Sequence, residues 1–134
     1  MRRPVLFHVA LVMAMISVAV TGMAGEGFIP VVAQSRGAGG SFWNTELWIS
    51  NPTTRKGSYA IVFLPSGHDN TRLLTEDPET TDIAAGATVH LKGVVPPNSI
   101  GALRVVTSDG LVVRCRVFNT RGRGSAGQLV PVLT

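Results

Sequence analysis

The chain has 134 residues, with 12 Lys or Arg and 8 Asp or Glu, for a formal net charge of +4. A chain of this length forms one domain around one core. The single cysteine excludes a disulfide within the chain, and the small charge excess excludes the dense basic stripe typical of nucleic-acid-binding proteins. Packing must therefore supply the stability of the fold.

Residues 1–24 have the organisation of a secretory signal peptide. Two arginines precede an apolar run over residues 5–20, and small residues at Gly22 and Ala24 suit a signal-peptidase site. The run is shorter than the ~20 residues that a membrane-spanning helix usually needs. We expect cleavage after Ala24, export to the periplasm or the cell exterior, and a mature domain over residues 25–134. Retention of the segment as a membrane anchor is the alternative.

The mature domain is nearly neutral. Removing residues 1–24 from the 134 leaves 110, and two of the 12 basic residues leave with the signal, so 10 basic and 8 acidic side chains give a net charge of +2. Every later hydrophobic stretch is strand-sized. We therefore expect no nucleic-acid partner and no transmembrane segment after signal cleavage.

Short apolar runs that end at Gly, Pro, Asn or Asp recur through the mature sequence, and no helical repeat is sustained. The expected strands span residues 28–34, 42–50, 58–64, 72–75, 87–91, 103–111 and 128–133, and one further strand surrounds Cys115. Proline cannot donate to a ladder, so Pro30 and Pro131 place the first and last strands at an edge or an irregular position. Residues 66–82 form an acidic surface excursion that contains the 72–75 strand.

About seven to eight short strands in 110 residues predict an all-β fold. We expect a single antiparallel β-sandwich of immunoglobulin-like kind, with a small β-barrel as the alternative. Alternation along residues 42–50 gives an inner face of Trp43, Thr45, Leu47 and Ile49. Cys115 alternates with Val113 and Val117, which predicts a buried thiol.

The strongest turn signal is Ser108-Asp109-Gly110. A two-residue hairpin loop there would mix the apolar and polar faces, whereas a three-residue loop pairs Val105 with Val113. We expect this second register, which places Arg104 opposite Arg114 on the outward face. Like charges opposite one another destabilise a sheet unless something neutralises them.

Several segments share a pattern with a known kind of exported domain. The segments are Ile-Pro-Val-Val-Ala at 29–33, Gly-Ser-Phe-Trp-Asn-Thr-Glu-Leu at 40–47, Asn-Pro at 51–52, Gly-Ala-Leu-Arg-Val at 101–105, Arg-Val-Phe-Asn-Thr at 116–120 and Gly-Gln-Leu-Val-Pro at 127–131. Together they resemble a β-sandwich module of secreted bacterial proteins for which no activity is known. The resemblance implies a sandwich that occurs alone or within larger exported proteins, and it carries no catalytic residues. Residues 67–82 depart from that pattern, being longer and more acidic.

Catalytic chemistry has little support in the sequence. A hydrolase would use His68 or His90, but no nucleophile elbow accompanies either of them. We expect a non-enzymatic protein without a cofactor. Calcium is the weaker alternative, with oxygen ligands from the acidic excursion at Asp69, Asn70, Glu76, Asp77, Glu79 and Asp82.

Two groups of side chains are candidates for a binding surface. Phe42 and Trp48, together with Tyr59, point away from the assigned core face and could form an aromatic platform for a sugar. The arginines Arg104, Arg114, Arg116, Arg121 and Arg123 are the second group, suited to an anionic glycan or an acidic protein. Ion pairs of these arginines with Glu79 and Asp82 are the structural alternative. The sequence therefore predicts a secreted binding, adhesion or structural module with a protein or glycan partner, and a carbohydrate-binding module as the alternative.

Overall fold

A computed structural model describes residues 25–134. The predicted signal peptide lies outside the described residues. The strands are β1 Gly25–Arg36, β2 Phe42–Ser50, β3 Gly57–Pro65, β4 Thr81–Ile83, β5 Thr88–Lys92, β6 Ser99–Thr107, β7 Val112–Arg121 and β8 Gly124–Val130. A single helical turn, α1 Thr71–Thr75, and a 3-10 turn, η1 Ala38–Gly40, complete the elements. The all-β prediction is confirmed.

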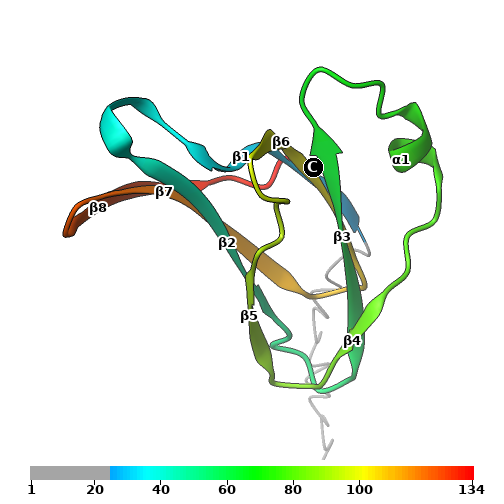
Figure 1. Ribbon diagram of the computed structural model, residues 1–134. Coiled ribbons are helices and arrows are strands. Elements are labelled where there is room, and N and C mark those ends of the chain that lie inside the picture. The colour runs from blue at the N-terminus through cyan, green and yellow to red at the C-terminus, as the bar shows by residue number, and fades with distance from the viewer. Residues whose placement is uncertain (1–24) are drawn as a thin grey trace, which may run out of the picture.

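The eight strands form one antiparallel sheet that curls into a half-barrel (Figure 1). Its order is β4-β3-β6-β1-β2-β7-β8, and β5 pairs with β2 beside this path. β1 links the two halves: it pairs with β6 along most of its length, and only Ser35 and Arg36 pair with β2. The curvature matches the small-barrel alternative, while the two halves face one another across a core.

A bulge bends β1 at the proline. The β1–β6 register shifts between Ile29 and Val32, so Pro30 falls where the ladder is interrupted and no N–H is needed. Pro30 thus occupies an irregular position within a central strand. Pro131 comes directly after β8, and the chain then crosses to β1, where Leu133 exchanges two backbone hydrogen bonds with Phe28.

Two clusters of inward side chains fill the space between the halves. The larger cluster consists of Ile29, Val32, Leu47, Val95, Leu103, Val105, Cys115, Val117 and Val130. The smaller one contains Ile49, Tyr59 and Ile83. Leu47 and Ile49 from the predicted face of β2 are fully buried, as is Cys115. Tyr59, expected among the outward aromatics, belongs to the core instead.

The predicted hairpin around Ser108–Gly110, with Val105 paired to Val113, is wrong. β6 pairs with β1 and β3, whereas β7 pairs with β2 and β8, so the Ser108–Gly110 turn connects the two halves. Val105 lies in the larger cluster, and Val113 packs against that cluster from the other half. Their apolar character reflects contact across the core rather than pairing along a ladder.

Two local predictions also differ from the structure. Residues 72–75 belong to α1 and not to a strand, with the Asp69 carboxylate accepting hydrogen bonds from Thr71 at the start of that turn. Trp43 is 37% exposed although it alternates with Leu47. It lies near the N-terminal end of β2, where its indole packs beside Gly37 and outside both core clusters.

Two buried polar side chains form hydrogen bonds with backbone groups that have no partner in the strand ladders. The Thr45 hydroxyl bridges to Ala33 of β1. Asn51 follows β2 and donates to the carbonyl oxygens of Arg55, Ile83 and Ala84. Within residues 25–134, no helix has the length and apolar character needed to cross a membrane.

Candidate binding surface

The outward side chains of β2, β5 and β7 form one mixed aromatic and cationic surface, which we call the outer face. Inward positions of these strands carry Leu47, Cys115 and Val117, so the alternate positions point away from the core. The outer face is made of Glu46, Trp48, His90, Lys92, Arg114, Arg116 and Phe118. The strand register sets these side chains in rows across the sheet.

One row is centred on Trp48. The register places it between His90 of β5 and Arg114 of β7. The Trp48 and His90 rings are stacked, with centroids 4.5 Å apart and planes 8° from parallel. His90 therefore covers one face of the indole, and that face is closed to a sugar ring unless the imidazole moves.

The next row is centred on Glu46, which lies between Lys92 and Arg116. Its carboxylate is 3.4 Å from His90 Nε2 and 4.0 Å from Lys92 Nζ. Arg116 lies over the Phe118 ring, with Cζ 4.6 Å from the ring centroid. The outer face thus carries three permanent cations, Lys92, Arg114 and Arg116, and one carboxylate, Glu46, so its net charge is positive and suits an anionic group.

The structure brings together only part of the predicted surface. Trp48, Arg114 and Arg116 share the outer face, and Arg114 is exposed. Phe42 begins the same strand six residues before Trp48, about 20 Å away at the usual rise of a strand. Arg121 and Arg123 are exposed at the β7–β8 turn, near that far end of the sheet.

Arg104 does not belong to this surface. It lies on β6 in the other half and is only 8% exposed. Its guanidinium forms an ion pair with Glu26 and donates to the carbonyl oxygens of Leu73 and Glu76, at 3.0 and 2.8 Å. Arg104 therefore fastens the segment containing α1 to the outside of the sheet, and the prediction that it faces Arg114 is wrong.

The outer face also contains residues that the sequence analysis did not assign to a surface. These residues are His90, which the sequence suggests only as a catalytic group, and Glu46, Lys92 and Phe118. The missing information was the β2–β5 and β2–β7 register, since strand alternation indicates the side of a residue but not its neighbours on other strands.

The two histidines considered for a hydrolase lie on different elements. His90 contacts Trp48 and Glu46, as described above. His68 is exposed in the loop between β3 and α1. A hydrolase would therefore need a separate nucleophile and orienting acid beside whichever histidine served as its base.

The acidic side chains considered as calcium ligands form hydrogen bonds or ion pairs with different partners. Asp69 accepts from Thr71, and these hydrogen bonds lower the pKa of its carboxyl group. Glu76 pairs with Arg72, and Asp82 pairs with Lys56 rather than with an arginine of the predicted group. Among residues 25–134, no three His, Cys, Asp or Glu side chains are grouped as a metal site would require.

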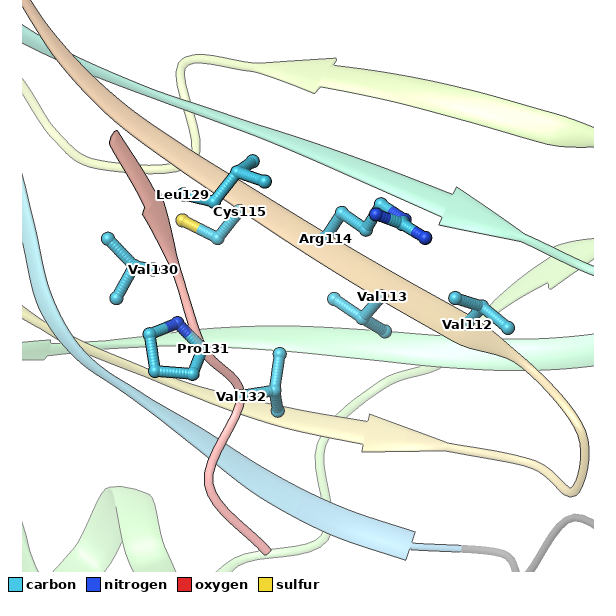
Figure 2. A pocket seen from close by; sticks show the side chains of 8 residues that line it. All are labelled: Val112, Val113, Arg114, Cys115, Leu129, Val130, Pro131 and Val132. Carbon is cyan, nitrogen blue, oxygen red and sulfur yellow. The ribbon is translucent and has the colours of Figure 1, made fainter. Parts of the chain in front are cut away.

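An apolar pocket of about 390 Å³ opens beside the outer face, where β8 ends (Figure 2). Its lining residues are Val112, Val113, Arg114, Cys115, Leu129, Val130, Pro131 and Val132. The β7–β8 ladder ends at the Cys115–Val130 pair, and the chain then turns toward β1, which leaves residues 112–114 of β7 uncovered. Figure 2 shows the Arg114 guanidinium pointing away from the C-terminal segment.

Cys115 is one of the residues that line this pocket, and its thiol is protonated and buried. Its side chain is 1% exposed, and burial raises the pKa of the thiol to about 11. The thiolate is the nucleophilic form of cysteine. At neutral pH Cys115 is therefore a small apolar core residue, in agreement with the sequence analysis.

No protein-family model and no curated protein matches the chain. Among solved structures, the chain is similar to the crystal structure of Thermotoga maritima 1070, with a TM-score of 0.60 and 12% sequence identity. The similarity covers 84% of this chain and 94% of that one. At this identity the similarity shows a shared fold alone.

Proposed function

We propose that this protein is an exported, non-enzymatic binding module whose outer face contacts an anionic partner, either an acidic glycan or an acidic protein surface. The observation that carries the proposal is the row arrangement of Trp48, Arg114 and Arg116 on one side of the sheet. Lys92 extends the same positive surface beyond Glu46. Export is supported by the signal-like residues 1–24.

The chemistry of the outer face favours charge over ring stacking. Arginine binds carboxylates and sulfates through paired N–H donors. The Trp48 ring already has His90 against one face, whereas a neutral sugar binds mainly by stacking on an open aromatic face. An acidic polymer is therefore the better first probe than a neutral one.

Polygalacturonate and polyglutamate, with laminarin as a neutral comparison, test the proposal. Trp48 fluorescence reports on the outer face once the other tryptophan is removed by Trp43→Phe. We expect the acidic polymers to change this fluorescence and the effect to weaken as salt is added, because salt screens exposed charges. A response to laminarin alone would instead support a carbohydrate-binding module that uses Trp48.

A charge-matched pair of variants locates the site. Arg114→Gln with Arg116→Gln should weaken binding of the acidic polymers at least tenfold. Arg55→Gln with Arg72→Gln removes the same charge from exposed positions elsewhere and should leave binding nearly unchanged. Equal losses in the two variants would mean that net charge, and not the outer face, governs binding.

Export has its own test. The mass of the protein recovered from the periplasm or the medium should correspond to a chain that begins at Gly25. Recovery of the full-length chain in the membrane fraction would favour the anchor alternative.

A further inference from the structure

The edge strand β8 differs from the other two edge strands of the described sheet, β4 and β5. It ends the strand order and pairs with β7 alone. Its sequence, Gly-Ser-Ala-Gly-Gln-Leu-Val, has no charged residue and no proline, and every residue except Val130 is exposed. Leu129 is 66% exposed.

The other edges carry features that oppose pairing with another chain. β4 has only three residues, and its Asp82 forms an ion pair with Lys56. β5 has five residues, including His90 and Lys92. Short length and charged side chains are the usual protection of sheet edges. β8 has neither, and Pro131 lies just beyond the strand rather than within it.

We propose that β8 pairs with β8 of a second copy of this chain, antiparallel across a two-fold axis. The distribution of charge selects this arrangement. Arg121 and Arg123 precede the strand, while uncharged Pro131 follows it. Antiparallel pairing places the arginines of each copy beside the uncharged end of the other, whereas parallel pairing would bring four arginines together.

A two-fold axis near Gly127 gives a specific register. Ser125 then lies opposite the partner's Leu129, and both side chains project on the same side of the sheet as Arg116. The small side chains at Gly124, Ser125 and Ala126 leave the edge backbone accessible. The dimer would join two outer faces into one continuous sheet, which doubles the surface available to a repetitive partner.

Paired charge variants test this register. Wild-type protein should form a dimer whose population rises with concentration in sedimentation velocity. Ser125→Lys with Leu129→Lys places lysines opposite one another across the axis and should reduce dimerisation at least tenfold. Ser125→Glu with Leu129→Glu should do the same. An equimolar mixture of the two variants should restore the dimer, since each lysine then faces a glutamate.

The control variant is Ser66→Lys with Thr80→Lys, which adds the same charge at exposed loop positions and should dimerise as the wild type does. Hydrogen exchange provides a second measurement, in which amides of β8 should gain protection as wild-type concentration rises. A wild-type protein that stays monomeric, or a lysine variant that dimerises normally, would overturn the proposal. Association through the outer face would instead respond to Arg114→Gln and not to the β8 variants.

Discussion

The Thr45 hydroxyl exchanges two 2.9 Å hydrogen bonds with the main chain of Ala33, one donated and one accepted. β1 and β2 are paired only at their turn-proximal ends, so at Ala33 the side chain of Thr45 takes the place of a neighbouring strand. Thr45 thereby connects β2 to β1 beyond the point where backbone pairing between these two strands ends.

Thr45→Val should destabilise the fold by about 2–4 kcal/mol, because it leaves a buried N–H and a buried C=O without partners. Thr45→Ser keeps the hydroxyl and should cost only about 1 kcal/mol for the lost methyl group. Urea unfolding followed by circular dichroism measures both. Equal losses in the two variants would show that the methyl group, and not the hydroxyl, matters here.

Arg104→Met should destabilise the protein by about 2–4 kcal/mol, because the carbonyl oxygens of Leu73 and Glu76 lose their donor and Glu26 loses its cation. Arg114→Met is the matched control at an exposed position and should change the unfolding free energy by less than about 0.5 kcal/mol. Hydrogen exchange should show the Arg104 effect concentrated in residues 71–76. Similar small effects of both substitutions would contradict the clamping role.

Asn51→Ala should cost about 3 kcal/mol, since the amide donates to three carbonyl oxygens and its Oδ1 accepts from Thr53. Asn51→Asp is nearly isosteric but has no donor, so it should be at least as damaging. Thermal unfolding measures both changes. An aspartate variant as stable as the wild type would show that the accepting oxygen alone holds these loops.

Cys115 should resist thiol reagents in the native protein at neutral pH and react only after unfolding, because its sulfur is buried and protonated. Burial raises the pKa of the thiol from 9.0 to about 11, so the folded state binds this proton more tightly than the unfolded state. The resulting stabilisation is complete below pH 9 and is lost as the pH rises to about 11. Cys115→Ala should remove this component of the pH dependence, which paired unfolding series at several pH values would detect.

Strand alternation predicted the local features of the core except at the end of β2, where Trp43 is exposed. Leu47, Ile49 and Cys115 are buried as their spacing indicates, and Pro30 lies at an irregularity because proline cannot serve a regular ladder. These properties depend on residues adjacent in the chain. They need no knowledge of which strands become neighbours.

The long-range features could not be obtained in the same way. Val105 and Val113 were matched as ladder partners because both are apolar, yet contact across a core imposes the same apolar character as contact along a strand. An arginine side chain is usually exposed, and the burial of Arg104 depends on the carbonyl groups of Leu73 and Glu76, about thirty positions earlier in the chain. The outer face was recognised in part because Trp48 and Arg114 alternate outward, but their juxtaposition required the β2–β7 register.

The backbone bridge between Phe28 and Leu133 makes the two ends of the described domain depend on one another. Apart from the short pairing of Ser35 and Arg36 with β2, the first strand finds its ladder partners in β6 and in the last residues of the chain, so its pairing is complete only when nearly the whole domain is present. A chain that lacks its C-terminal residues leaves the backbone of Phe28 without this partner.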